Sequence, residues 1–183
     1  RKANSFYNRH GHRLRPEPGT PIKEDYEYRR AGTRNIFLAV EPKGGHRQAE
    51  VTARRTKPDF VRFIGRLVEK VYAGAQKIHL VMDNLNTHFR SSLEEVLGIE
   101  RAEQMLARVE FHYTPKHASW LNMAEIEIGV MDRQCIGGRL PSESMLRSEV
   151  AAWKHRRNQA KAKIEWKFTR QDADDKLSRH YVL

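Results

Sequence analysis

Two acidic residues that lie far apart in the sequence, Asp83 and Glu125, are the strongest candidates for chemistry in this chain. Asp83 follows a short apolar run at 78–82, which is typical of a buried β-strand. Its charged side chain is therefore expected at the strand exit, where ligands of open α/β sheets bind. Glu125 falls in a predicted helix at 121–135. Divalent ions held by carboxylates from such distant positions can promote phosphodiester cleavage by water, so we predict that Asp83 and Glu125 are catalytic metal ligands.

Each acid also has a purely structural interpretation. Asp83 and Asn84 could form an Asx turn where the strand ends, without any metal. Glu125 lies three residues after Asn122, which is the spacing of a helix capping box. The neighbouring Glu127 lies about 200° round the helix from Glu125 and is the weaker ligand candidate. The residues alone leave both interpretations of Glu125 open.

The charge of the chain points to a polyanionic partner. Its 34 Lys and Arg residues against 23 Asp and Glu residues give a formal net charge of +11, and the sequence pI is about 10.0. Values this basic are typical of nucleic-acid-binding domains, although a solvated basic surface or a scaffold protein would have the same composition. We predict DNA as the partner. The candidate DNA-binding residues are Arg54, Arg55, His88, Lys116, Arg156 and Arg157.

Cysteine, histidine and hydropathy patterns restrict the type of protein. Cys135 is the only cysteine, which excludes an intramolecular disulfide and a zinc site built from paired cysteines, and fits a reducing cytosol. His88, His112 and His117 lack the i, i+4 spacing of helical metal ligands, so solvated or hydrogen-bonded roles are expected. No apolar run approaches the ~20 residues of a membrane span, and the first residues lack the apolar middle of a signal peptide. We predict a cytoplasmic protein without a membrane partner.

The periodicity predicts one α/β domain after a basic segment at 1–34, which shows neither helical nor strand periodicity. The expected strands are 36–40, 47–53, 78–82 and 109–113, and the strand at 78–82 is expected to be buried on both faces. The expected helices are 59–73 with a cap at Thr56, 92–107 with a break near Gly98, 121–135, 142–162 and 171–181. The buried stripe of the helix at 142–162 should consist of Leu146, Val150 and Trp153.

Several ordered sequence blocks resemble one known family. The segments VMDNLNTH, HYTPKHASWLNMAEIE, RQC and RNQAKAKIEWKFTRQDADDKL, with DYEYRRAGTRNIF and TARRTKPDF before them, closely resemble the catalytic domain of bacterial insertion-sequence transposases in the mariner-like DDE superfamily. The resemblance implies an RNase H-like mixed sheet flanked by helices. It also implies that three acids bind two Mg²⁺ (or Mn²⁺) ions for DNA strand cleavage and strand transfer.

The resemblance also assigns roles to individual residues. Asp83 matches the second Asp of the family, and Glu125 matches the closing Glu of an LN-x-x-E pattern whose Asn is Asn122. Asn84 and His88 match polar positions that accompany the acids. This match favours the metal-ligand interpretation of Glu125 over the capping box.

One family feature has no counterpart in this sequence. The first Asp of the family ends a strand ahead of the DYEYRRAGTRNIF segment, and residues 1–34 contain no apolar run that ends in an acid. We therefore expect a truncated transposase, with a basic remnant at 1–34 and a catalytic domain at 35–183 whose first strand is missing or incomplete. Its C-terminal helices are expected at 142–183.

The expected partners are DNA, as transposon ends and target, and other protein subunits. The chain would act as a homo-oligomer or as a mixed oligomer with full-length transposase, associated with the bacterial nucleoid. With two of three acids it is expected to be inactive alone. The alternative is a non-catalytic DNA-binding or regulatory remnant of a transposase, which would not need the acids. An RNase H-type RNA nuclease fits the transposase motifs less well.

Overall fold

The fold is built on a long antiparallel hairpin. The computed structural model describes residues 4–9, 28–83, 90–114, 122–138 and 140–177. Strands β2 (Tyr28–Glu41) and β3 (His46–Thr52) form the predicted hairpin. Gly45 closes the turn by donating its N–H to the Glu41 carbonyl at 2.9 Å, and its φ of 71° lies in the left-handed region. A Cβ at Gly45 would lie 2.5 Å from the backbone of Lys161, so the turn requires glycine.

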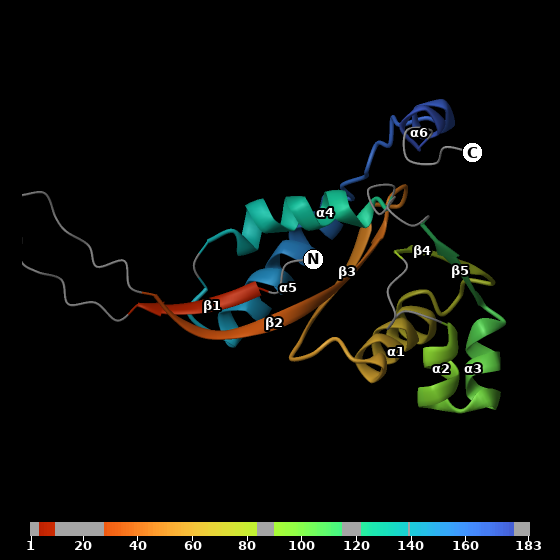
Figure 1. Cartoon of the computed structure of the whole chain (residues 1–183), viewed down its shortest axis with the longest axis horizontal. Helices are drawn as coiled ribbons and strands as arrows, with labels where there is room; N and C mark the ends of the chain where they lie inside the picture. The colour runs from red at the N-terminus through yellow and green to blue at the C-terminus, as the bar shows by residue number, and fades with distance from the viewer. Residues whose placement is uncertain (1–3, 10–27, 84–89, 115–121, 139, 178–183) are drawn as a thin grey trace, which may run out of the picture.

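Strand pairing extends into the amino-terminal segment. β1 (Asn4–Arg9) pairs antiparallel with the first half of β2, which gives the strand order β1-β2-β3. The expectation that residues 1–34 contain no strand is wrong, and β2 crosses the predicted boundary between residues 34 and 35. The pairing is made by backbone hydrogen bonds, which a search for alternating apolar side chains does not detect. In Figure 1, β1 and this half of β2 project away from the remaining elements.

Helix α1 (Lys57–Arg66) packs on one face of the hairpin. Thr56 and Asp59 bond reciprocally in a capping box at its start, which confirms the predicted cap. The ring of Phe63 stacks on that of Phe37 from β2, with centroids 5.5 Å apart. The apolar face of α1 therefore anchors the helix to the hairpin.

A second sheet consists of two parallel strands, β4 (Ile78–Met82) and β5 (Val109–Tyr113). Both strands were predicted. Gly98, with a φ of 80°, separates two short helices at the predicted break. The helical elements that accompany this sheet are η1 (Leu67–Val71, π-helical), α2 (Arg90–Leu97) and α3 (Ile99–Leu106).

The described elements cover only one face of the β4–β5 sheet. Ile78, Leu80 and Met82 pack against the main apolar core, whereas Val81 on the opposite face is 55% exposed. The prediction of a strand buried on both faces is therefore wrong, because α1, η1, α2 and α3 all contribute to the same core on one side. The buried members of this core are Phe37, Phe60, Val61, Phe63, Ile64, Leu67, Val68, Leu93, Ala102, Met105 and Val109.

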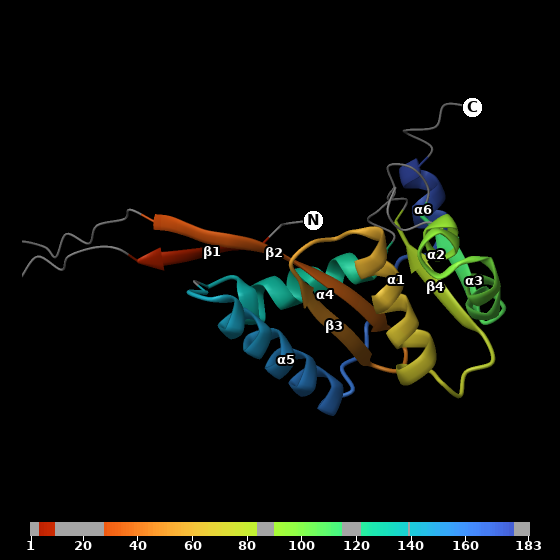
Figure 2. The same cartoon turned by 90° about the horizontal axis from the view of Figure 1, so that it is seen from below.

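The described strands form two sheets, whereas the resemblance implies a single mixed sheet. Phe37 and Ala39 of β2 belong to the same apolar core as Leu80 of β4, so side-chain packing joins the two sheets. Figure 2 shows α1 beside both of them. The described part of the chain is thus an α/β fold in which antiparallel and parallel pairing occur in separate sheets.

The carboxyl-terminal helices cover the other face of the hairpin. They are α4 (Ala124–Met131), η3 (Asp132–Ile136, π-helical) and α5 (Glu143–Gln159), and α6 (Arg170–Leu177) follows. Val51 of β3 meets Leu146 and Val150 of α5 in a second core. Trp153 is fully buried and donates its Nε1–H to Gln134 at 3.0 Å, so the predicted buried stripe is confirmed. No helix among the described residues has the length and apolar character to cross a membrane.

A buried ion-pair cluster joins β3, α4 and α5. The fully buried Glu127 carboxylate accepts hydrogen bonds from Arg47 at 2.7 and 3.0 Å and from Arg157 at 3.0 and 3.2 Å. Arg47 also donates to the Gly45 carbonyl at 2.8 Å, and its backbone bonds to the Asn158 side chain in both directions. We call Arg47, Glu127 and Arg157 the buried cluster. Because its charges are paired away from water, it fixes α4 on the hairpin.

Substitution Glu127→Gln should lower the free energy of unfolding by about 3–5 kcal/mol, because it leaves buried guanidinium charge without a counter-ion. Urea unfolding followed by circular dichroism measures this. Glu125→Gln, two residues away and exposed, is the control and should change the value by less than ~0.5 kcal/mol. Equal stabilities of the two variants would contradict the role of the buried cluster.

The capping box of α1 predicts an acid-dependent contribution to stability. Burial alone would raise the pKa of Asp59, but hydrogen bonds from Thr56 and Arg62 outweigh burial and lower this pKa below its usual value. The stabilisation is therefore complete above about pH 5 and is lost as the pH falls through the folded-state pKa. The free energy of unfolding is measured by urea titration at several pH values. Asp59→Asn should reduce the loss of this free energy at acidic pH, whereas Thr56→Ser should retain the loss. An unchanged loss in Asp59→Asn would refute this account.

Candidate active site

Asp83 lies at the carboxyl end of β4, as predicted. It directly follows Met82, whose carbonyl accepts the Thr114 N–H at 2.9 Å, so β4 and β5 remain bonded up to the end of both strands. The Asp83 side chain is half-buried. The sheet thus fixes the position of Asp83. A catalytic site requires such a rigid element to place a carboxylate accurately.

Glu125 lies in the first turn of α4 and is exposed. The Asn122 side chain accepts the Ala124 N–H at 3.1 Å, and the Asn122 carbonyl accepts the Glu125 N–H at 2.9 Å. Across the residues that the structure describes, the Glu125 carboxylate takes part in no hydrogen bond or ion pair, so it does not return the bond of a capping box. The Asn122 side chain therefore bonds to the first turn of α4 without Glu125, whose side chain is exposed.

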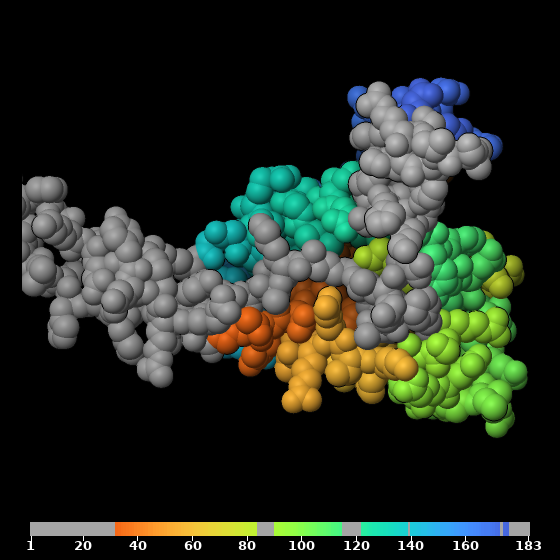
Figure 3. Space-filling model, in the orientation of Figure 1, coloured from red at the N-terminus to blue at the C-terminus, as the bar shows by residue number. Residues whose placement is uncertain are grey.

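The elements that carry these two acids approach each other at their ends. In Figures 1 and 2, the amino end of α4 lies on the same side of the molecule as the carboxyl ends of β4 and β5. Figure 3 shows that α4 forms an open surface on this face. Glu127 lies on roughly the opposite side of α4 from Glu125, so burying Glu127 turns Glu125 towards solvent.

Three predicted site residues lie outside the described part of the chain. They are Asn84 and His88, in the segment 84–89 after β4, and Lys116, in the segment 115–121 after β5. Their roles, and the possible Asx turn between Asp83 and Asn84, stay predictions. Both segments directly follow the strand ends at which Asp83 lies.

The predicted DNA-binding arginines fall into two groups. Arg54 and Arg55 follow β3, Arg156 lies on α5, and all three are exposed. Arg157 differs, because two of its guanidinium nitrogens bond to the buried Glu127 carboxylate and its side chain is only 22% exposed. The structure therefore gives Arg157 a part in the fold rather than an open position for a phosphate.

Comparison with known proteins identifies the family. A family model described as DDE superfamily endonuclease matches residues 8–147, which is most of the chain. The chain belongs to the DDE superfamily endonucleases. A search of the curated proteins and a search of the solved structures each returned no match.

The DDE match bears directly on the candidate residues. It spans Asp83 and Glu125 but ends at residue 147, before Arg156 and Arg157. DDE domains of transposase type cleave DNA and generally use divalent metal ions, so DNA is the substrate that the family implies. The two acids therefore lie inside the matched region, whereas the cationic part of α5 lies beyond it.

The DDE domain also contains a polar cluster that the sequence analysis missed. His79 and His112 lie 3.0 Å apart, Nδ1 to Nε2, with Glu110 beside both. The hydrogen-bonded role expected for His112 is confirmed. His79 went unrecognised because only the parallel pairing of β4 with β5 brings it to His112. The available signal was the i, i+2 spacing of Glu110 and His112, which places both on one face of a strand.

Cys135 is excluded as a nucleophile of the DDE domain at neutral pH. Burial, reinforced by the negative charge of Glu149, raises the pKa of the Cys135 thiol to about 11. The thiolate is the reactive form of cysteine, and it is scarce so far below the pKa. Cys135 is therefore a poor nucleophile at neutral pH.

Two neighbouring substitutions should separate DNA contact from folding. Arg156→Gln removes an exposed cation, so it should leave the free energy of unfolding within ~0.5 kcal/mol and reduce the slope of log K against log salt for duplex DNA by about one. Arg157→Gln should instead destabilise the fold by more than ~1 kcal/mol, because it removes two hydrogen bonds to the buried Glu127 carboxylate. Fluorescence anisotropy and urea unfolding measure both. A reversed pattern would show that the two arginines are wrongly assigned.

Proposed function

We propose that this chain is the catalytic part of a bacterial insertion-sequence transposase of the mariner-like type, with an RNase H-like fold. In this proposal Asp83 and Glu125 hold divalent ions for DNA strand cleavage and strand transfer. The observation that carries the proposal is the DDE match across both acids, together with an exposed Glu125 carboxylate at the start of α4 that bonds to none of the described residues.

The chemistry of the two acids suits a hard divalent ion. Mg²⁺ and Mn²⁺ prefer carboxylate oxygens, and Mg²⁺ usually takes only one or two carboxylates and keeps several waters. Asp83 and Glu125 offer such oxygens from separate elements whose ends lie on the same side of the molecule. Asp83 and Glu125 would hold these ions, and the bound ions would supply positive charge for activating the attacking oxygen and stabilising the leaving oxygen of a phosphodiester.

The protein contributes position and charge to this reaction. The β4–β5 pairing holds Asp83, and the buried cluster holds the helix that carries Glu125. Exposed arginines, among them Arg54, Arg55 and Arg156, are proposed to bind phosphates and so keep the scissile strand near the acids. A net charge of +11 steers DNA towards the protein.

The proposal includes an incomplete set of acids. Only two of the family's three acids have a matching carboxylate in this sequence. Two carboxylates hold a metal ion more weakly than three. We infer that the chain alone binds DNA and does not cleave it. Cleavage would then need a third carboxylate supplied within a homo-oligomer or by full-length transposase in a mixed oligomer.

The second candidate is a non-catalytic DNA-binding protein that regulates transposition. The observation that favours it is the same mismatch of acids, because a regulatory remnant needs the basic surface and the fold but not the metal. The two candidates differ in what Mg²⁺ does. A catalytic domain should bind DNA more tightly when ions bridge its carboxylates and the phosphates, whereas a simple binder should not.

The deciding experiment measures DNA affinity and nicking together. The chain is incubated with a supercoiled plasmid and with a labelled duplex, with Mg²⁺, Mn²⁺ or a chelator, as wild type, Asp83→Asn and Glu125→Gln. Glu100→Gln is the matched control, because Glu100 is an exposed glutamate in the first turn of α3. An RNA–DNA hybrid substrate tests for RNase H-type activity.

We expect a metal-dependent gain in DNA affinity that is lost in both Asp83→Asn and Glu125→Gln and kept in Glu100→Gln, without nicking. Robust nicking that Asp83→Asn abolishes would show that Asp83 is correctly assigned to the active site. It would also show that the inference of an incomplete set of acids is wrong. If DNA affinity does not change with metal or with any of the three substitutions, the catalytic assignment is overturned in favour of the non-catalytic DNA-binding protein. Cleavage of the hybrid alone would assign an RNA nuclease.

A further inference from the structure

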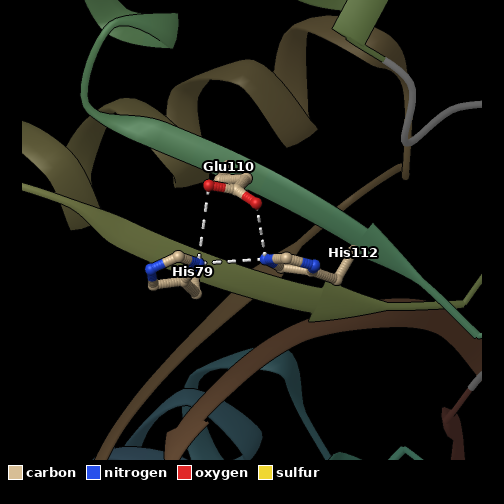
Figure 4. Close-up of side chains that lie close together, drawn as sticks. All are labelled: His79, Glu110 and His112. Carbon is tan, nitrogen blue, oxygen red and sulfur yellow. Dashed lines mark hydrogen bonds and ion pairs between the residues drawn. The ribbon is translucent and has the colours of Figure 1, made fainter.

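The open face of the β4–β5 sheet carries a cluster of metal-binding side chains that the DDE chemistry does not use. His79 extends from β4, and Glu110 and His112 extend from β5 (Figure 4). His79 pairs with Glu110 in the parallel register, and Glu110 and His112 are two residues apart, so all three side chains share one face. This is the same uncovered face that leaves Val81 exposed.

The three side chains converge closely. His79 Nδ1 lies 3.0 Å from His112 Nε2 and 3.8 Å from Glu110 Oε2, and His112 Nε2 lies 3.4 Å from Glu110 Oε1. Their ligand atoms all lie within 4.8 Å of one another. A four-coordinate zinc ion, with Zn–N distances of about 2.0–2.1 Å, sets neighbouring ligand atoms about 3.3–3.4 Å apart. The two distances to Glu110 involve different carboxylate oxygens, so its side chain must rotate to bring one oxygen and both nitrogens around a single ion.

The donor set selects the type of metal. Two imidazole nitrogens and one carboxylate suit Zn²⁺ and similar transition-metal ions, whereas Mg²⁺ prefers oxygen ligands throughout. The cluster is also chemically different from Asp83 and Glu125, which offer oxygen alone. In addition, each side chain is between 45% and 60% exposed, so an ion can reach them from solvent.

We propose that His79, Glu110 and His112 form a binding site for a transition-metal ion of the zinc type. The ion takes one nitrogen from each histidine and one oxygen from Glu110, and water fills the remaining position on the solvent side. Both imidazoles bind the ion as neutral rings, so the donor ring of the His79–His112 hydrogen bond carries its single N–H on the other ring nitrogen when the ion is bound.

The consequence of binding is a cross-link between the two strands of the sheet. β4 ends at Met82 and Asp83 follows immediately, so the ion stabilises the strand that carries the first candidate catalytic acid. The sheet has two described strands, and no described element covers the face that carries the cluster. An isolated two-stranded sheet is only marginally stable, so a cross-link between its strands should stabilise it. An ion that binds only the folded state also raises its melting temperature.

The test is a zinc titration of the chelator-treated, full-length chain by calorimetry, with Co²⁺ absorption as a report on four-coordinate geometry. The variants are His79→Ala, His112→Ala and Glu110→Gln, all at exposed positions. His155→Ala is the control, because His155 is an exposed histidine on α5. A double variant, Asp83→Asn with Glu125→Gln, separates this site from the proposed catalytic one.

We expect one Zn²⁺ per chain, bound at least about tenfold more weakly in each cluster variant and unchanged in His155→Ala and in the double variant. Zinc should raise the melting temperature of the wild type but not of His79→Ala, and excess Mg²⁺ should not displace it. The proposal fails if no saturable binding occurs, or if the cluster variants bind zinc as the wild type does. Loss of binding only in the double variant would assign the ion to Asp83 and Glu125 instead.

Discussion

The buried pairing of one carboxylate with two guanidinium groups determines how β3, α4 and α5 meet. Glu127 receives hydrogen bonds from Arg47 of β3 and Arg157 of α5, and it lies on α4 between them. A buried charge is tolerated only when its hydrogen bonds are satisfied, so the three elements cannot slide independently. The outward position of Glu125 follows from this constraint, because burying Glu127 leaves the opposite side of the same helix facing solvent.

The β4–β5 sheet applies a second constraint at the other candidate acid. Its apolar face packs with β2 and α1 in the main core, while its polar face is uncovered. Asp83 therefore extends from a strand that is anchored on one side only. The same arrangement leaves His79, Glu110 and His112 accessible, so a donor set with imidazoles lies on the sheet that Asp83 follows, whereas Glu125 lies on α4.

Much of this structure follows from local patterns in the sequence. The hairpin, the Thr56 cap, the break at Gly98 and the buried stripe of α5 depend on turn residues and periodicity, which act over a few residues. The position of Asp83 at a strand end and of Glu125 within a helix was predicted for the same reason. The pairing of β1 and the open face of β4 depend on distant partners, so the pattern of the residues themselves did not reveal them.

The buried cluster shows the same limit at single residues. Arg47, Glu127 and Arg157 lie in three separate segments, and their charges are typical of a solvated surface until the fold brings them together. The assignment of Arg157 to DNA contact rested on its position in a basic helix, which does not distinguish an exposed cation from a buried one. The cluster of His79 and His112 was missed because their proximity depends on the β4–β5 register.

The central claim is that Asp83 and Glu125 bind the same divalent ions, and a double-mutant cycle tests it most directly. The affinity of Mn²⁺ in the presence of duplex DNA is measured by electron paramagnetic resonance for wild type, Asp83→Asn, Glu125→Gln and the double variant. If the two carboxylates share ions, the double variant loses little more affinity than either single variant, because each substitution removes the same site. Losses that simply add, or the absence of any loss, would contradict the account.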